Sequence, residues 1–363
     1  MSSDGPNPFL RFRDRLDSYQ PVRSGRMSDD EFVGIVSDLD AAVASVEGSG
    51  FTETPVTMAP ELAAAIGLTA ELIIKDETLN VSGSHKARHL MGVAIDMLVS
   101  EALGAPESGQ LAIASCGNAA LAAGVVAAAM ARPLEVFVPV WADQIIVDRL
   151  IELGANITSC ERRPNEVGDP AYLRFREAVA GGSVPFSVQG TDTPTTFDGG
   201  RTLSWELAEQ ASGIGSIYIQ VGGGALATAV SMALPSAALY PVQSSGCAPL
   251  RRAWDLLAPG FDLVEAGANP GKYMRAWDEP TSTATGILDD ITYDWLPLLE
   301  RTLETGGRPV VALEPSIDQA YDLANKHTEI KVSPTGSAGL AGLMADLPVG
   351  VKKVAVLFTG IDR

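Results

Sequence analysis

A lysine, two turns rich in small or polar residues and a hydroxyl follow one another along this chain in an order that could build a reaction site. The amine of Lys86 could form a Schiff base with a carbonyl group and then act as a general base. Residues 115–118 read Ser-Cys-Gly-Asn, and residues 222–225 read Gly-Gly-Gly-Ala. Backbone N–H groups in such turns, at the start of a helix, bind carboxylates or phosphates. Thr335, in the run Ser-Pro-Thr-Gly, adds a neutral hydroxyl.

Each of these parts also has an ordinary structural explanation. Most lysines lie on exposed surfaces, glycine-rich turns also serve nucleotide-binding folds, and Ser-Pro-Thr-Gly is a common turn. The glycines at 222–224 do not have the GxGxxG spacing of a dinucleotide site, and no acidic residue ends a following strand at the right distance. The ordered combination is more informative than any member, and it predicts an enzyme.

The motifs in this order resemble the fold type II, or tryptophan-synthase-β-like, group of pyridoxal-phosphate (PLP) enzymes. The run 80–88, Asn-Val-Ser-Gly-Ser-His-Lys-Ala-Arg, is similar to the segment that carries the Schiff-base lysine of that family. The resemblance covers roughly 72–360 and includes Gly-Arg-Thr-Leu-Ser-Trp-Glu-Leu at 200–207. It implies that pyridoxal 5′-phosphate is the cofactor and that Lys86 is the catalytic residue.

The resemblance also implies a role for each motif. Lys86 would hold the PLP aldehyde and take the proton from the substrate Cα, Asn118 would bind the 3′-oxygen of the ring, and Thr335 would face the pyridine nitrogen. A neutral hydroxyl there makes the ring a weaker electron sink, which suits elimination or replacement over transamination. The predicted cofactor-binding residues are Lys86, Asn118, Gly222, Gly223, Gly224, Ala225 and Thr335, and the predicted substrate-binding residues are Ser84, Ser115, Cys116 and Gly117.

Finer features resemble threonine synthases and threonine dehydratases. Lys-Asp-Glu at 75–77, Asn-Pro-Phe at 7–9 and the segment 243–250 are similar to threonine synthase, whereas Ala87 is similar to the dehydratases and His85 to tryptophan synthase β. The prediction is a lyase of threonine synthase type that removes the Cα proton and eliminates a β- or γ-group. A threonine/serine dehydratase (ammonia-lyase) and a β-replacement enzyme of cysteine-synthase type stay open. A non-catalytic nucleotide or effector binding protein is a remote alternative.

Strands and helices must position these residues, and the hydrophobic pattern predicts them. A capped helix begins near Ser28, and strand-like runs at 72–74 and 111–114 then alternate with helices at 87–103 and 119–131. This alternation predicts parallel sheets, with ligands at the carboxyl ends of the strands. Further strands are expected at 134–138, 156–158, 216–221, 240–243 and 353–358, and further helices at 142–153, 171–180, 202–212, 225–233, 317–325 and 337–344.

The alternation falls into two blocks and predicts an α/β protein of two open-sheet domains, with the PLP site in the cleft between them. Residues 1–90 and 196–363 are assigned to a larger PLP-binding domain. Residues 91–195 are assigned to a smaller α/β domain whose mobility is left open. The segment 266–293 is rich in Gly, Pro, Asp and Thr, so it is expected to form a long irregular connection near the site.

Composition narrows the range of partners. The chain has 363 residues and a net charge of −19, which argues against nonspecific nucleic-acid binding because such proteins concentrate Lys and Arg. The three cysteines and three histidines have no metal-ligand spacing, so no metal site is predicted. The run 113–131 is uncharged but rich in alanine and interrupted by polar residues, which favours a buried helix over a membrane span.

The expected setting is the cytoplasm, because the N-terminus has neither the basic start nor the apolar core of a secretory signal. The expected partner is a small amino-acid substrate. A homodimer is implied by the family resemblance alone. The leaving group, any second substrate and any effector are left open.

Overall fold

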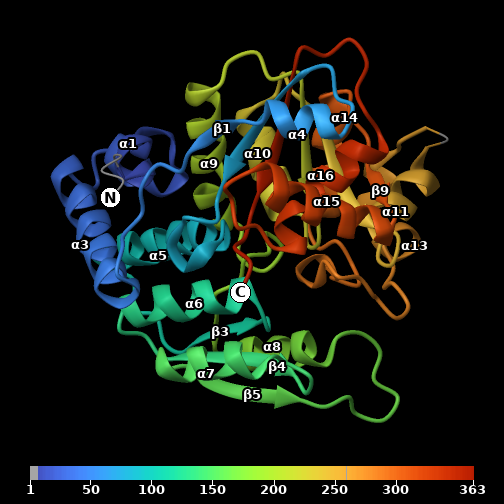
Figure 1. Ribbon diagram of the computed structural model, residues 1–363. Coiled ribbons are helices and arrows are strands. Elements are labelled where there is room, and N and C mark those ends of the chain that lie inside the picture. The colour runs from blue at the N-terminus through green and yellow to red at the C-terminus, as the bar shows by residue number, and fades with distance from the viewer. Residues whose placement is uncertain (1–6, 259) are drawn as a thin grey trace. The chain divides into compact units, whose positions relative to one another are not determined.

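The computed structural model describes residues 7–258 and 260–363 (Figure 1). Backbone contacts divide the chain into two compact units, each with its own sheet. Unit 1 comprises the described part of 1–53 together with Asn80–Leu203, and unit 2 comprises Thr54–Leu79 together with the described part of 204–363. Helices and open sheets are both present, so the prediction of an α/β fold with open sheets is confirmed.

Unit 1 contains a four-stranded parallel sheet in the order β5-β4-β3-β6. Helices α6 and α8 both pack on β3 and β4. The strands are β3 (Leu111–Ala114), β4 (Leu134–Pro139), β5 (Asn156–Cys160) and β6 (Val184–Pro185). The helices are α1 (Pro8–Arg11), η1 (Arg13–Arg15), η2 (Asp17–Tyr19), α2 (Gln20–Arg23), α3 (Asp29–Glu47), η3 (Val81–Gly83), α5 (Lys86–Ala102), α6 (Asn118–Ala129), α7 (Gln144–Glu152) and α8 (Pro170–Ala180).

Helix α3 begins and ends for the reasons that the sequence indicates. Ser28 Oγ accepts a hydrogen bond from the Glu31 N–H at 3.2 Å, and the Glu31 carboxylate accepts one from the Ser28 N–H at 2.7 Å. This reciprocal capping box satisfies two N–H groups at the helix start. Gly48 then ends the helix with a left-handed φ of 88°. The buried stripe of α3, which forms as predicted, consists of Phe32, Val36, Leu39 and Val43.

Unit 2 contains a six-stranded sheet in the order β1-β2-β10-β7-β8-β9, in which only β1 runs antiparallel to its neighbour. The strands are β1 (Val56–Met58), β2 (Glu71–Asp76), β7 (Ser216–Gln220), β8 (Ala238–Ser244), β9 (Val310–Ala312) and β10 (Lys353–Phe358). The helices are α4 (Pro60–Ala65), α10 (Ala225–Ala233), α11 (Pro249–Leu257), α12 (Leu263–Ala268), α13 (Pro270–Tyr273), η4 (Thr285–Ile287), α14 (Trp295–Glu304), α15 (Glu314–His327) and α16 (Pro334–Ala345).

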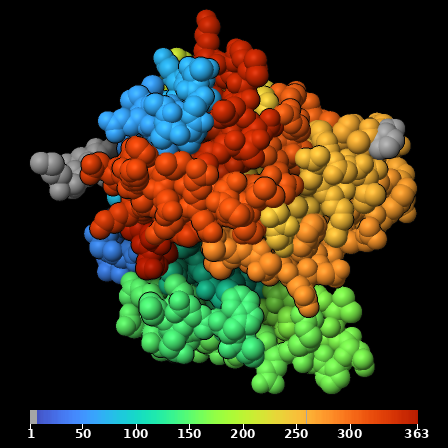
Figure 2. Space-filling view, turned by 45° about the vertical axis from the view of Figure 1, so that its right-hand side comes forward, coloured from blue at the N-terminus to red at the C-terminus, as the bar shows by residue number. Residues whose placement is uncertain are grey.

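The core of unit 2 lies between its sheet and α16, which packs on β7, β8, β9 and β10. Outside α16 lies α15, and α4 packs against α15 in turn. Figure 2 shows the light-blue segment that contains α4 beside the red-orange segment that contains α15. Fully buried side chains of this core include Leu62, Leu72, Ile74, Tyr218, Ile317, Leu340, Val356 and Phe358.

The two compact units place some segments differently from the predicted domains, 1–90 with 196–363 and 91–195. The segments 7–53 and 80–90 belong to unit 1, because α3 packs against α5 and α6 and η3 packs against α6. Helix α9 (Thr196–Gln210) begins earlier than the expected start at 202, and it contributes residues to both units. The functional domain boundaries stay a prediction.

In the part of the chain that the structure describes, no helix is long and apolar enough to cross a membrane. The uncharged run 113–131 instead divides between the end of β3, a polar turn and helix α6. Every residue from Ala119 to Ala127 is buried, as expected for an alanine-rich helix inside a protein.

Candidate active site

Lys86 is the first residue of α5, and a strained loop precedes it. The Asn80 side chain accepts a hydrogen bond from the Val81 N–H at 2.9 Å, and Ser82 adopts a left-handed φ of 54°. A left-handed backbone conformation at a serine costs about 1–3 kcal/mol and persists only where the surrounding structure holds it. Such strained residues are common at functional sites. Ser84 is fully buried, and its Oγ has no hydrogen-bond partner among the described residues.

The position of Lys86 favours the neutral amine that the predicted chemistry needs. Lys86 is half-buried, and it lies at the N-terminal end of α5. The helix dipole places partial positive charge at this end and therefore disfavours the charged ammonium form of the side chain. Arg88 is fully buried, and its guanidinium donates a hydrogen bond to Thr202 Oγ1 at 3.0 Å. Lys86 is therefore better exposed to a ligand than Arg88 is.

The second motif lies where it was predicted, between the carboxyl end of β3 and the start of α6. The Ser115 N–H donates to the Phe137 carbonyl at 3.2 Å, and the Gly117 N–H donates to Ser115 Oγ at 3.4 Å. Gly117 is the N-cap of α6 and offers no capping side chain, so backbone donors at this helix start suit a carboxylate. Ser115, Cys116, Gly117 and Asn118 are all half-buried.

Unit 1 therefore contains Ser84, Lys86 and the 115–118 turn. Helix α6, which starts at that turn, packs against both η3 and α5. The remaining predicted residues, the 222–225 turn and Thr335, belong to unit 2.

The glycine turn of unit 2 connects β7 to α10 and is fully buried. Gly224 has a left-handed φ of 103°, and no side chain caps α10. A Cβ on Gly222 would meet the Asp289 carboxylate, with Ile287 Cα 3.1 Å away. A Cβ on Gly224 would lie 3.2 Å from Thr292. Both glycines are therefore required locally, and the N–H groups at the start of α10 form a ready anion site.

Thr335 is the second residue of α16, whose N-cap is Ser333. Its Oγ1 accepts a hydrogen bond from the Gly286 N–H at 3.0 Å. A hydroxyl that accepts from one backbone donor keeps its own hydrogen for an acceptor elsewhere. The hydroxyl hydrogen of Thr335 is thus available to an acceptor.

The segment 275–293 explains how the glycine turn and Thr335 are fixed in unit 2. Apart from the short η4 it is irregular, as predicted for most of 266–293, although α12 and α13 occupy the first part of that range. The Asp289 carboxylate of this segment lies against Gly222, and its Gly286 N–H donates to Thr335 Oγ1. Directly after the segment, the Asp294 N–H donates to the Gly223 carbonyl at 2.8 Å. Sequence reasoning missed Gly286 and Asp289, because no local motif indicates contacts made so far along the chain.

The Lys-Asp-Glu motif at 75–77 proves to be a buried network of unit 2. The Lys75 ammonium donates to Glu206 at 2.6 Å, to the Thr54 carbonyl at 2.7 Å and to Gln210 at 2.9 Å. Lys75 and Glu206 are completely buried, so each charge depends on its neighbours for solvation. The motif that resembled threonine synthase therefore has a structural role here.

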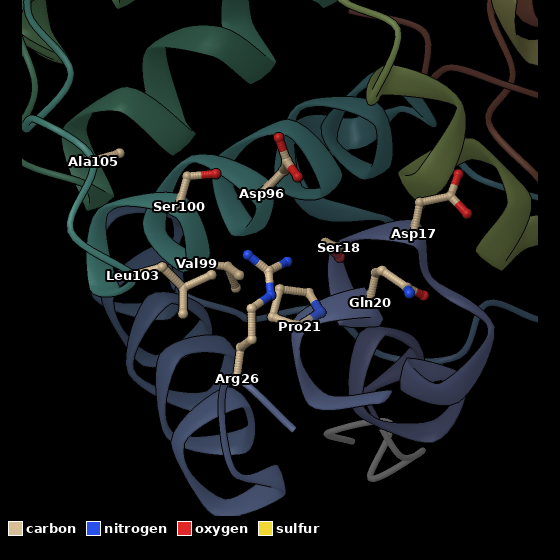
Figure 3. Close-up of a pocket in the computed structure, with 10 residues that line it drawn as sticks. All are labelled: Asp17, Ser18, Gln20, Pro21, Arg26, Asp96, Val99, Ser100, Leu103 and Ala105. Atoms are coloured by element: carbon tan, nitrogen blue, oxygen red, sulfur yellow. The ribbon is translucent and has the colours of Figure 1, made fainter. Parts of the chain in front are cut away.

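A separate hollow of about 450 Å³ lies in unit 1, lined by residues from 17–26 and 96–105 (Figure 3). Burial, together with the nearby carboxylates of Asp198 and Asp17, raises the pKa of Asp96 in its wall. None of the predicted site residues lines this hollow. We therefore do not place the candidate active site there.

The family model described as pyridoxal-phosphate dependent enzyme matches residues 49–360. The chain belongs to this family. The resemblance to fold type II PLP enzymes is thereby confirmed, PLP is the cofactor, and the alternative of a non-catalytic binding protein is excluded.

The sequence relatives of this PLP enzyme carry names of lyases of amino-acid metabolism, and one structural neighbour is a racemase. The β-hydroxyaspartate dehydratase of Paracoccus denitrificans is 25% identical to this chain, over a region that covers 80% of this chain and 85% of the dehydratase. The threonine synthase of Mycobacterium leprae is 25% identical over 82% of this chain and 76% of its own. The serine racemase structure from Dictyostelium discoideum has a TM-score of 0.69 at 20% identity, covering 90% of this chain and 98% of its own. The enzyme is accordingly a PLP-dependent lyase.

The residues present fit PLP on three observations. Lys86 offers a half-buried amine at a helix start. The 222–224 turn leaves space that a Cβ atom would fill, and the backbone N–H groups at the start of α10 beside it have no side-chain cap. Thr335 Oγ1 accepts from the Gly286 N–H and keeps its own hydrogen for a second partner. An aldehyde, a phosphate and a ring nitrogen are the groups that these three features suit.

Proposed function

We propose that this enzyme removes the Cα proton of an amino acid and eliminates a group from Cβ or Cγ, in the manner of threonine synthase. The observation that carries the proposal is the hydrogen bond from the Gly286 N–H to Thr335 Oγ1 at 3.0 Å. It leaves the Thr335 hydroxyl hydrogen to be donated to an unprotonated ring nitrogen. A nitrogen without a full positive charge supports elimination better than transamination.

Lys86 supplies the base in this proposal. Its Nζ would hold the cofactor aldehyde and, when free of it, would take the proton from the substrate Cα. When bound, PLP withdraws electron density from Cα and so makes that proton removable. The helix start at Lys86 favours the neutral amine that this proton transfer requires.

The remaining motifs bind the substrate and the cofactor and orient them relative to Lys86. The 115–117 turn and the backbone N–H groups at the start of α6, with the Ser84 hydroxyl, bind the substrate carboxylate, and Asn118 binds the ring 3′-oxygen. The N–H groups of Gly222, Gly223, Gly224 and Ala225 bind the cofactor phosphate. Cys116 fills space beside the substrate, which is the usual role of a partly buried cysteine.

A threonine/serine dehydratase is the second candidate, and one observation favours it. A substrate that carries its own phosphate needs a cation near the ring. Arg88, the cation of the lysine motif, is fully buried and donates a hydrogen bond to Thr202 Oγ1 at 3.0 Å. Among the relatives, L-threonine ammonia-lyase of Thermotoga maritima and the Paracoccus dehydratase carry names of this second type. A β-replacement enzyme of cysteine-synthase type is the third.

The deciding experiment measures phosphate released from O-phosphohomoserine and 2-oxobutyrate formed from L-threonine by the PLP-loaded enzyme. Phosphate with threonine as the organic product supports threonine synthase, and 2-oxobutyrate alone supports the dehydratase. The Lys86→Ala variant is the control, and it should lose both reactions together with the visible absorption band. A band that persists in this variant would overturn the role of Lys86.

We further propose that the enzyme is a cytoplasmic homodimer, on the support of the family resemblance. Light scattering on the purified protein tests the dimer, and cell fractionation tests the location.

A further inference from the structure

The buried imidazole of His89, close to Lys86, has no role in the reaction proposed above. His89 follows Lys86 by about one turn of α5, so the two side chains lie on the same face of the helix. Only 1% of His89 is exposed. Its Nδ1 lies 2.8 Å from the backbone carbonyl oxygen of Thr196.

This contact fixes the form of the ring. A carbonyl oxygen only accepts, so Nδ1 carries the hydrogen and donates it to Thr196. Burial, followed by the positive charges of Lys86 and Arg88, lowers the pKa of His89 to about 3. The ring is therefore neutral at physiological pH, and Nε2 carries a lone pair. Among the described residues, Nε2 has no hydrogen-bond partner.

The backbone around His89 is closely packed, which holds the ring in this orientation. A Cβ on Gly199 would lie 3.0 Å from the Cα of His89 and would overlap the Arg88 carbonyl oxygen. The start of α9 is thus held against α5, and the Thr196 carbonyl cannot withdraw without breaking that contact. On its other side the His89 ring meets His85 edge to face, with centroids 5.7 Å apart.

The groups around the ring leave Lys86 as the natural donor to Nε2. Helix α6 carries no ionisable side chain, η3 carries none, and α3 buries an apolar stripe. Helix α9 contributes Asp198, whose carboxylate accepts from the Asp17 and Ser18 N–H groups at 2.9 and 3.0 Å. The positive charges that act on His89 come from Lys86 and Arg88, and Arg88 is bound to Thr202.

We propose that His89 is a positioning residue for the reaction: its Nε2 accepts a hydrogen bond from the Lys86 ammonium whenever Lys86 is detached from the cofactor and protonated. This inference rests on the proposed role of Lys86. The proton leaves the substrate Cα and binds Lys86 Nζ, which gives it up again before it holds the cofactor once more, while His89 remains neutral throughout. The hydrogen bond stabilises the ammonium, which makes Lys86 a stronger base and holds its Nζ in place.

The test compares two substitutions. His89→Phe keeps an aromatic ring for His85 but removes the acceptor, whereas His89→Gln keeps an acceptor oxygen. Without the acceptor the Lys86 ammonium is less stable, so the apparent pKa on the acidic limb of kcat should fall by about one unit and kcat by about tenfold. His89→Gln should stay closer to the wild type in both, and KM should change little.

A second readout does not need turnover. Cofactor-free protein is mixed with PLP across a range of pH, and the rate at which the visible band returns reports the fraction of Lys86 that is neutral. The midpoint of this rate against pH should move down by about one unit in His89→Phe. An unmoved midpoint and an unmoved kcat limb would overturn the proposal, as would equal shifts in His89→Phe and His89→Gln.

Outcomes that concern folding or Lys86 itself can be told apart from these. If His89→Phe does not fold, His89→Leu replaces it, and the comparison with His89→Gln still decides. A merely structural role would lower the melting temperature and reduce kcat equally at every pH, which counts against the proposal. A visible band that survives in Lys86→Ala would instead overturn the proposed function.

Discussion

A Cβ atom on Gly199 would overlap the backbone carbonyl oxygen of Arg88, so α9 begins in direct backbone contact with α5. A Cβ on Gly92 would in turn lie 2.5 Å from the Gly199 nitrogen, which means that the two helices meet at a pair of glycines. Helices approach this closely only where side chains are absent. The contact fixes the segment that begins with the proposed catalytic lysine.

Gly199→Ala should therefore lower the free energy of unfolding by about 1–3 kcal/mol, because the added methyl group must displace backbone. Urea denaturation of the PLP-loaded protein measures the loss. The matched control is Gly34→Ala in α3, where a Cβ would meet no atom within 4 Å. That change should be neutral or stabilising by up to about 1 kcal/mol. Equal stabilities for the two variants would contradict the close packing.

The elements that could be predicted from sequence are those whose own residues define them. The strand Lys353–Phe358 is an apolar run that is buried from its second residue, and its predicted bounds agree with the structure. The strand Val56–Met58 was missed, because it has three residues and none of them is buried. The start of α9 at Thr196 was missed for another reason. Two adjacent glycines, Gly199 and Gly200, read as a break, whereas Gly199 lies within the helix and packs against α5.

In the candidate site too, short contiguous motifs could be predicted from the sequence, whereas contacts between distant residues could not. The lysine loop and the glycine turn could be predicted as parts of a site because each is a contiguous run with backbone chemistry of its own. The roles of Gly286 and Thr196 could not, because the bonds to Thr335 and His89 join residues 49 and 107 positions apart. Nothing in a short window of sequence indicates such contacts. The structure was needed to recognise His89 as a neutral acceptor.

The buried pair Lys75 and Glu206 should be sensitive to the removal of one charge. Lys75→Met leaves the fully buried Glu206 carboxylate without its ammonium, so the free energy of unfolding should fall by about 3–5 kcal/mol. The double variant Lys75→Met with Glu206→Gln removes both charges and keeps an acceptor for the Thr54 N–H, which now bonds to Glu206 at 3.2 Å. It should be more stable than the single variant. A double variant that is less stable would refute the charge-based explanation.

Asp29 should titrate at unusually low pH. Arg13 donates two hydrogen bonds to its carboxylate, at 2.7 and 3.0 Å, and Tyr19 donates a third at 2.6 Å. The Arg13 bonds first, and then the Tyr19 bond, lower the pKa of Asp29 to about 2. Because the folded pKa is depressed, the stabilisation is present above the ordinary pKa of 3.8 and is lost as the pH falls through about 2.

Carboxyl NMR of the intact protein checks this prediction. Arg13→Gln should raise the pKa of Asp29 toward its ordinary value, and Tyr19→Phe should raise it by less, since the Arg13 bonds lower it more. An Asp29 that titrates near 3.8 in the wild type would show that the ion pair does not persist in solution.

Thr335 offers the sharpest test of the proposed site, because its hydroxyl can be removed at little cost to folding. Gly286 is exposed, so in Thr335→Val its N–H can bond to water, and the melting temperature should change little. The hydrogen bond that we propose between the hydroxyl and the ring nitrogen would be lost, however. One such bond is worth about 0.5–1.5 kcal/mol, so kcat/KM should fall by up to about tenfold and the visible band should shift. Thr335→Ser, which keeps the hydroxyl, should remain close to the wild type in both. If Thr335→Val has the kcat/KM and the spectrum of the wild type, Thr335 does not contact the cofactor, and the argument from its hydroxyl to elimination chemistry fails.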